Sequence, residues 1–317
     1  MNASGKRKEK KMISRRDFLR YCGISAAALG LSSLDLLNLK EALANPGAPS
    51  VIWLQGSSCT GCSVSFLNRI SSTAPKTAAE ILTNSINLIY HPNLMSVAGQ
   101  SAAAIAEEAA VRGGHVLVVE GGIPTAFNGG ACHAWTYNGA DVTFADAVTK
   151  LSANAAAIIA VGACSAFGGI PAVSKLTGVK SVNAHTGKQS INIAGCPPHP
   201  DWIAWTVVQL LLNNSIPLDS YGRPVYLFGK TIHDQCPRRT ASEATAYGQQ
   251  GRCLANLGCK GPITQGNCPT LKWNNGVNWC VDANATCIGC TNPDFPAHVL
   301  MPGRIIGSGP GREGEED

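Results

Sequence analysis

The order of the cysteines constrains this chain more than any other feature. Cys59-Thr60-Gly61-Cys62 comes first, single cysteines follow at Cys164 and Cys196, and seven more lie between Cys236 and Cys290. Eleven of the 13 cysteines, together with His233, divide into three sets of four soft ligands. Iron-sulfur clusters are held by sets of this kind, so the pattern predicts three clusters and a path for electrons.

Residues 1–44 have the features of a twin-arginine export signal. A lysine-rich start precedes Ser14-Arg15-Arg16-Asp17-Phe18-Leu19, and a mildly apolar run over 24–39 ends in Ala42-Leu43-Ala44. The run contains several serines and glycines, Asp35 and Asn38, so it would make a poor membrane-spanning helix. We therefore expect cleavage after Ala44 and a periplasmic protein without a membrane anchor of its own.

The charge of the chain belongs to this signal. The full sequence has a net charge of +5, but its first 44 residues carry nine of the 25 basic and four of the 20 acidic side chains. The remainder carries 16 of each and is neutral. No basic stripe with interleaved aromatic residues occurs, so the sequence offers no electrostatic footprint for nucleic acid.

Disulfides and zinc are two other uses of so many cysteines. An oxidising compartment favours disulfides, but the twin-arginine route carries proteins that have already folded, often around a metal cofactor. Cys-x-x-Cys also suits a structural zinc site. The first four cysteines are spread over about 140 residues, which is more than a compact zinc module needs.

Residues 45–213 alternate between short apolar runs and helical stretches. This alternation implies a parallel sheet with helices on both faces, so we expect a flavodoxin-like, doubly wound α/β domain. The expected strands are 51–54, 86–90, 115–119, 157–161 and 191–194. The expected helices are 63–70, 102–111, 144–151 after a turn at Asp141, and 202–212 with Asp201 as its cap.

The first four cysteines follow three of these strands. Cys59 and Cys62 come after the first strand, Cys164 after the fourth and Cys196 after the fifth. Open α/β sheets bind ligands in the crevice at the carboxyl ends of their strands, so these four side chains can converge there. A nucleotide is the rival occupant, but no Gly-x-Gly-x-x-Gly or phosphate-binding loop follows the first strand.

Residues 214–317 differ in character, because Gly, Pro and Asn are dense and long apolar stretches are few. We expect an irregular, loop-rich domain that metal clusters organise, followed by a flexible acidic tail. Spacing alone does not identify His233 as a ligand.

At this point the sequence resembles the small subunits of periplasmic nickel-iron hydrogenases, from the signal through Phe295. The resemblance rests on the following motifs: Cys59-Thr60-Gly61-Cys62-Ser63, Glu120-Gly121-Gly122-Ile123-Pro124, Gly162-Ala163-Cys164, Gly195-Cys196-Pro197-Pro198-His199-Pro200, His233 with Cys236, Gly258-Cys259-Lys260-Gly261-Pro262, and Cys287-Ile288-Gly289-Cys290.

The resemblance implies three iron-sulfur clusters. The proximal 4Fe-4S cluster would be held by Cys59, Cys62, Cys164 and Cys196, and the distal 4Fe-4S cluster by His233, Cys236, Cys253 and Cys259. The medial cluster would be held by Cys268, Cys280, Cys287 and Cys290. Many members of the family have a proline where this chain has Cys280, and they hold a 3Fe-4S centre. The extra cysteine predicts a medial 4Fe-4S cluster, similar to the nickel-iron-selenium group.

The resemblance also implies a division of labour. An obligate partner, the large subunit, would hold the nickel-iron centre, while this chain would carry electrons and contain no catalytic residue. A soluble multihaem cytochrome c is the expected acceptor, with a membrane-bound complex as the alternative. A different function, an iron-sulfur electron-transfer module of another exported oxidoreductase, stays open. The direction of hydrogen turnover and the role of Cys132 are not determined by the sequence.

Overall fold

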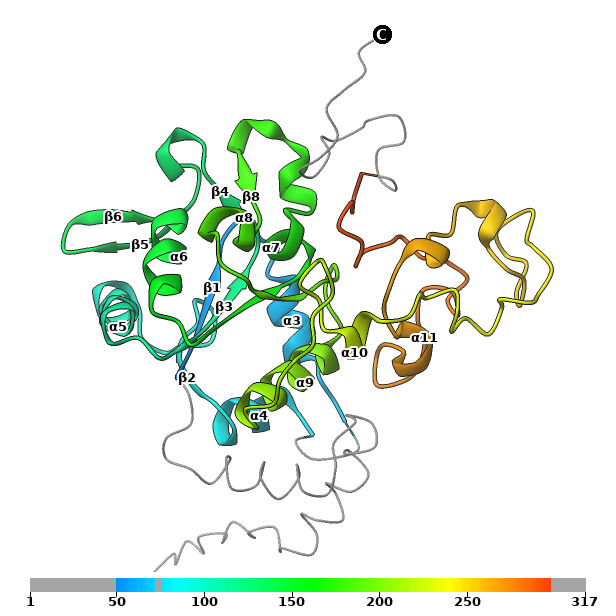
Figure 1. The fold of residues 1–317 in the computed structure, drawn as a ribbon, viewed down its shortest axis with the longest axis horizontal. Helices are drawn as coiled ribbons and strands as arrows, with labels where there is room; N and C mark the ends of the chain where they lie inside the picture. Colours follow the sequence, from blue (N-terminus) through cyan, green and yellow to red (C-terminus); the bar gives the residue numbers. More distant parts are fainter. Residues whose placement is uncertain (1–49, 72–75, 298–317) are drawn as a thin grey trace, which may run out of the picture.

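The computed structural model describes residues 50–71 and 76–297 (Figure 1). The predicted export signal and the acidic tail lie outside the described residues. The centre of the molecule is a five-stranded parallel sheet whose strands are arranged β2-β1-β3-β7-β9. These strands are β1 (Ser50–Gln55), β2 (Asn87–Tyr90), β3 (Val116–Glu120), β7 (Ala157–Val161) and β9 (Ile191–Ile193). In chain order the strands read 2-1-3-4-5, which confirms the flavodoxin-like prediction.

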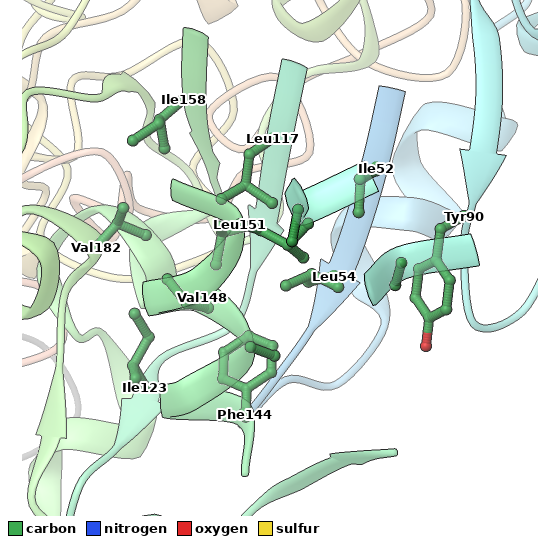
Figure 2. Close-up of a cluster of buried hydrophobic side chains, with 14 of the residues drawn as sticks. Ile52, Leu54, Tyr90, Leu117, Ile123, Phe144, Val148, Leu151, Ile158 and Val182 are labelled. Atoms are coloured by element: carbon green, nitrogen blue, oxygen red, sulfur yellow. The ribbon is translucent and has the colours of Figure 1, made fainter. Parts of the chain in front are cut away.

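The strands are apolar on both sides because helices cover both faces of the sheet. One face is covered by α5 (Gly99–Arg112), α6 (Phe144–Ala153) and α8 (Val182–Thr186), which bury their side chains on Ile52, Leu54 and Leu117 (Figure 2). The opposite face is covered by α3 (Gly61–Leu67), α4 (Ala78–Asn84), α9 (Pro200–Leu211) and α10 (Val225–Phe228). Helices on alternate faces are the consequence of right-handed crossovers in a parallel sheet.

Two predicted helix starts need correction. Helix α3 begins at Gly61 rather than at residue 63, so Cys62 lies in its first turn. Helix α9 is capped by His199 and not by Asp201, because the His199 ring accepts a hydrogen bond from the Asp201 backbone N–H at 3.1 Å. Asp201 instead forms an ion pair with the buried Arg69, with a distance of 2.9 Å between Oδ1 and Nε.

Several small elements were not predicted. Strands β5 (His133–Tyr137) and β6 (Ala140–Thr143) form an antiparallel hairpin. The expected turn at Asp141 is wrong, because Asp141 lies within β6 and the hairpin turns at 138–139. A second pair joins β4 (Ile123–Pro124) to β8 (Val179–Lys180). Helix α7 (Ala163–Phe167) follows β7 directly and carries Cys164. These elements are too short to produce a recognisable hydrophobic period.

Residues beyond α10 form loops, as expected, with α11 (Cys268–Leu271) as a short helix among them. Their buried apolar cluster consists of Ile232, Ala244, Leu254, Trp279, Val281 and Cys287. In Figure 1 this part of the chain lies to one side of the sheet and its helices.

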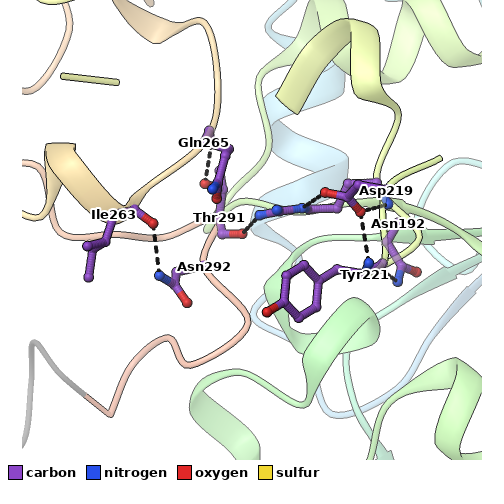
Figure 3. A network of polar contacts seen from close by, with 8 residues as sticks. Asn192, Asp219, Tyr221, Ile263, Gln265, Thr291 and Asn292 are labelled. Carbon is purple, nitrogen blue, oxygen red and sulfur yellow. Dashed lines mark hydrogen bonds and ion pairs between the residues drawn. The ribbon is translucent and has the colours of Figure 1, made fainter. Parts of the chain in front are cut away.

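Arg223 joins this loop-rich region to the sheet domain through Asp219 and Thr291, both labelled in Figure 3. Its guanidinium is 2% exposed and bonds the Asp219 carboxylate through Nε at 2.8 Å. Its Nη1 donates to the Thr291 carbonyl at 3.0 Å, 68 positions away in sequence. A planar guanidinium can hold a carboxylate and a carbonyl simultaneously, so this one side chain fixes two distant segments.

Within residues 50–71 and 76–297, no helix combines the length and apolar character that crossing a bilayer requires.

Candidate cluster-binding sites

The structure brings the first four predicted ligands together at the carboxyl ends of the strands. Cys59 lies just after β1, Cys62 in the first turn of α3, Cys164 in α7 after β7, and Cys196 after β9. Burial raises the pKa of the Cys62 thiol, and Glu120 and then Cys164, Cys59 and Cys196 raise it further by charge repulsion. These four thiols, the proximal set, therefore interact with one another although they come from three separate strand ends.

Such thiols are poorly suited to be free thiolates. Burial raises the pKa of Cys164 to about 12, with a further contribution from the neighbouring Cys196. Metal ions reverse this preference, because a coordinated thiol is deprotonated by the charge of the metal. A positively charged iron core is consistent with this donor set.

The turn after β7 must allow close approach to the proximal set. Gly162 has a φ of +98°, and a Cβ built there would lie 2.6 Å from the Cys62 sulfur. A side chain would therefore both strain the backbone and push into the ligand position.

A buried carboxylate supports the proximal set. Glu120, at the end of β3, is 1% exposed. Its Oε1 accepts from the Cys62 backbone N–H at 3.1 Å and from the Ser58 hydroxyl at 3.2 Å. Its Oε2 accepts hydrogen bonds from Trp53 Nε1 at 3.0 Å, Gln55 Nε2 at 3.2 Å and Ser63 Oγ at 2.5 Å. Five donors around one carboxylate fix the loop that carries Cys59 and Cys62.

His91, which directly follows β2, extends this network. Its Nδ1 accepts from the Asn93 backbone at 3.1 Å, so the hydrogen-bond network assigns the proton to Nε2, which lies 3.1 Å from Ser63 Oγ. Burial lowers the pKa of His91 to about 4, although Glu120 opposes the shift. The imidazole is therefore neutral at pH 7.

The distal set lies around a pocket in the loop-rich region. His233, Cys236, Cys253 and Cys259 line this pocket together with Arg238 and Trp279. Burial raises the pKa of Cys236, and Cys259 and Cys253 contribute through charge repulsion. The structure thus gathers all four predicted distal ligands, including His233.

Trp279, one of the residues that line this pocket, carries an unpaired donor. Its Nε1–H is buried, and among the described residues it has no hydrogen-bond partner. An unpaired buried donor is unfavourable unless something accepts from it. Cluster sulfurs are acceptors, so the donor set fits an iron-sulfur cluster.

The medial set combines a buried thiol, Cys287, with an exposed one, Cys280. Burial raises the pKa of Cys268 to about 12 and that of Cys287 to about 11. Cys290 has a raised pKa for the same reason, with Cys268, Cys287 and Cys280 adding charge repulsion. Cys280 thus lies with the other three predicted ligands.

The three sets adjoin one another in a line. The backbone of Cys196, in the proximal set, hydrogen-bonds the Cys290 sulfur of the medial set. The Cys287 N–H of the medial set lies 3.4 Å from the Cys259 sulfur of the distal set. The medial set is therefore in contact with the proximal set on one side and with the distal set on the other.

Single-ion sites are not formed by these side chains. Among the residues that the structure describes, no three His, Cys, Asp or Glu side chains are arranged to share one metal ion. A four-iron cluster binds each ligand through a different iron atom, so its thiolates are held further apart than those of one zinc ion.

Sequence reasoning did not identify Glu120, Trp279 or His91 as parts of these sites. Glu120 stood only within one of the family motifs, and a charged residue at a strand end was the one available signal. Cys132 is half-buried beside the apolar cluster under α5 and α6, where burial raises its pKa.

The doubly wound domain gathers four thiols in its crevice, and the loop-rich region adds seven thiols and an imidazole. Together these features define an oxidoreductase of the metal-cluster type. Residues 228–301 match the family of C-terminal domains of NiFe/NiFeSe hydrogenase small subunits, and residues 59–210 match the family of the 20 Kd subunit of NADH ubiquinone oxidoreductase. The chain belongs to the family of [NiFe] and [NiFeSe] hydrogenase small subunits.

Curated relatives support this membership over nearly the whole chain. The periplasmic [NiFeSe] hydrogenase small subunit of Desulfomicrobium baculatum is 40% identical, covering 90% of this chain and 96% of the relative. The periplasmic [NiFe] hydrogenase small subunit 1 of Nitratidesulfovibrio vulgaris is 38% identical, covering 89% and 90%. The solved [NiFeSe] hydrogenase of Desulfovibrio vulgaris Hildenborough superposes with a TM-score of 0.74 at 40% identity, covering 80% of this chain and 96% of that chain.

Proposed function

We propose that this chain relays electrons between the nickel-iron site of a hydrogenase large subunit and an external carrier, through three 4Fe-4S clusters. The observation that carries the proposal is the unbroken line of ligand sets, joined by the Cys196–Cys290 and Cys287–Cys259 contacts. An electron relay needs redox centres close enough for tunnelling, and adjoining ligand sets meet that need.

The chain's residues would divide the work as follows. The proximal, distal and medial sets would each hold one cluster as four-ligand sites, and the iron would supply one-electron chemistry when bound. Glu120 would fix the proximal loop, and Trp279 would donate its N–H to a sulfur of the distal cluster. Both groups would tune the reduction potential through hydrogen bonding and charge.

Cys280 supports a complete medial cubane. Its pKa is raised by burial, and it lies near the other medial thiols. A fourth thiolate can retain the fourth iron that a proline cannot. The oxidised complex should therefore lack a stoichiometric paramagnetic signal from a 3Fe-4S centre.

The large subunit would dock over the proximal set. Cys59 is exposed, and the adjoining helix α3 presents Val64 and Leu67 to solvent. Ile70, just beyond the helix, is exposed as well. Apolar side chains beside an exposed ligand are consistent with a permanent interface that a partner covers.

The export route and the domain boundaries are part of the same proposal. Residues 1–44 would direct twin-arginine export, 45–213 would form the proximal-cluster domain, and 214–317 the medial and distal domain with its tail. The relatives named above are periplasmic, which supports a periplasmic location for this chain.

A second function rests on the match of residues 59–210 to the ubiquinone oxidoreductase family. Under that alternative the chain would serve another exported oxidoreductase. The match of residues 228–301 to a hydrogenase-specific family favours the hydrogenase.

The test is hydrogen-dependent reduction of a viologen by the native complex, purified anaerobically through a tag on this chain. The proposal predicts activity with a large subunit that co-purifies. An iron-loaded complex with a different partner and no hydrogen-dependent reduction after reductive activation would favour the alternative.

A further inference from the structure

The segment that carries the distal set is basic, although the chain without its predicted signal is neutral. Between residues 229 and 263 there are five basic side chains and only two acidic ones, Asp234 and Glu243. The basic residues are Lys230, Arg238, Arg239, Arg252 and Lys260. A local excess of one sign produces a potential that a neutral protein otherwise lacks.

These side chains adjoin the distal ligands themselves. Arg238 lines the same pocket as His233 and Cys236. Arg252 and Lys260 are the immediate neighbours of Cys253 and Cys259 along the chain. We call the five residues the basic rim, because Arg238 lines this pocket and the other four lie within three positions of a distal ligand in the sequence.

Little of this charge is neutralised by neighbouring carboxylates. Within the described ranges, the ion pair of the basic rim is Arg239 with Asp234, at 3.7 Å, and both side chains are more than half exposed. Arg238 donates to neutral acceptors instead, the Asn284 side chain at 3.0 Å and the Arg252 carbonyl at 3.4 Å. Exposed charges of one sign attract a partner of the opposite sign.

Most of the segment that carries the rim lies apart from helix α3. Its loops near residue 250, drawn in yellow in Figure 1, are at the side of the molecule farthest from the sheet. The exposed apolar residues of α3 lie beside the proximal set. One surface thus suits a permanent apolar contact and the other a transient electrostatic one.

We propose that the basic rim docks a soluble redox protein with an acidic patch around its own redox centre. The inference rests on the proposed function and names the chemistry of the carrier. Each encounter would move one electron from the distal site to the carrier, oxidising the former and reducing the latter. A lipid surface is also anionic, but headgroups accept no electrons, so the chemistry of a relay favours a redox protein.

The experiment uses the native heterodimer, hydrogen as donor and two forms of one probe. Mitochondrial cytochrome c is basic, and its succinylated derivative carries carboxylates in place of lysine charges. The readout is the reduction rate of the acidic probe divided by that of the basic probe, both measured on one preparation. Differences in the rate of hydrogen oxidation affect both rates equally and therefore cancel in this ratio. The test variant is Lys230→Gln/Arg239→Gln/Arg252→Gln, and the matched control is Arg112→Gln/Lys175→Gln/Lys180→Gln, whose side chains are also exposed.

We expect the ratio for the wild-type complex to fall by about ten-fold between low and high ionic strength. At low ionic strength the test variant should lower the ratio by a similar factor, and the control variant should leave it unchanged. A ratio that changes neither with ionic strength nor in the test variant would refute the proposed docking surface. So would binding to phosphatidylglycerol vesicles without any dependence of the ratio on the test variant. Failure of hydrogen to reduce either probe or a viologen would instead refute the proposed function.

Discussion

The sheet domain and the loop-rich region reach a stable fold by different means. The sheet domain buries an apolar cluster on each face, with contributions from the sheet strands and from the helices that cover them. The loop-rich region has one cluster of six buried residues, of which Cys287 is a predicted cluster ligand. The contrast teaches that one chain can combine two kinds of domain. An apolar core stabilises the first, whereas cluster ligand sets must hold the second together.

The physical reason is the balance between burial and chain entropy. Apolar burial contributes roughly 25 cal/mol per Å², while ordering each residue costs about 1–2 kcal/mol. The eight buried apolar side chains described beyond residue 228 cannot order about 70 residues on that scale, whereas metal binding can supply folding free energy directly.

Removal of iron should have the largest effect on the fold, and it should affect the loop-rich region more than the sheet domain. In the complex depleted of iron, amide hydrogens in 229–297 should lose protection from exchange, because the ligand sets no longer cross-link their loops. Strands β1, β3 and β7 should keep their protection. Hydrogen exchange measured by mass spectrometry on loaded and depleted samples checks both parts. Equal loss in the two regions would mean that the sheet domain also depends on its cluster.

The second prediction concerns the carboxylate that links the sheet to the proximal set. Glu120→Ala should lower the free energy of unfolding by about 3–5 kcal/mol, since it leaves five hydrogen-bond donors without their acceptor. Glu107→Ala is the matched control, because Glu107 is a partly exposed carboxylate that bonds Lys150 and Trp135. Thermal unfolding of the two variants should separate clearly, and similar losses would contradict the role given to Glu120.

The third prediction tests the junction between the two regions. Arg223→Ala should destabilise the protein by about 2–4 kcal/mol, because it removes the guanidinium that bonds the Thr291 carbonyl and Oδ2 of Asp219. The loss of exchange protection should be greatest near residue 291. Arg239→Ala, at an exposed ion pair, should change stability by less than about 1 kcal/mol. A uniform loss of protection would show that Arg223 does not act as a local junction.

The smallest predicted effect is a pH dependence that belongs to the sheet domain. Burial lowers the pKa of His91 to about 4, below its usual value of 6.5, so the unfolded state binds the proton more tightly. Stability from His91 should be complete above pH 6.5 and should be lost as the pH falls towards 4, with a slope of at most about 1.4 kcal/mol per pH unit. His91→Gln should flatten that slope in unfolding curves recorded from pH 4.5 to 7. Parallel slopes for the variant and the wild type would refute this contribution.

The sequence was most informative where the physics is local. Apolar runs such as 157–161 match β7 at both ends, because a buried parallel strand needs little besides continuous apolar residues. The position of cysteines after the first, fourth and fifth strands predicts that they meet, since the carboxyl ends of parallel strands share one edge, and their thiols do interact in the structure.

Other features depend on contacts between distant residues. The predicted cap of α9 was wrong because Asp201 has a tertiary partner, Arg69, that its local sequence does not reveal. The five donors around Glu120 come from several segments, and no spacing rule brings them together. Net charge alone did not indicate the basic rim. The chain beyond residue 44 is neutral, because acidic residues elsewhere balance the charge of the rim.

Iron content with Mössbauer spectroscopy of the anaerobic heterodimer tests the central claim most directly, namely that this chain holds three four-iron clusters. The account predicts about 12 cluster iron atoms per chain, as three cubanes, with no 3Fe-4S centre before or after mild oxidation. In the Cys280→Pro variant, one cubane should become a 3Fe-4S centre while the other two persist. About eight cluster irons in the wild type, or a cubane count that Cys280→Pro leaves unchanged, would contradict the assignment of the ligand sets.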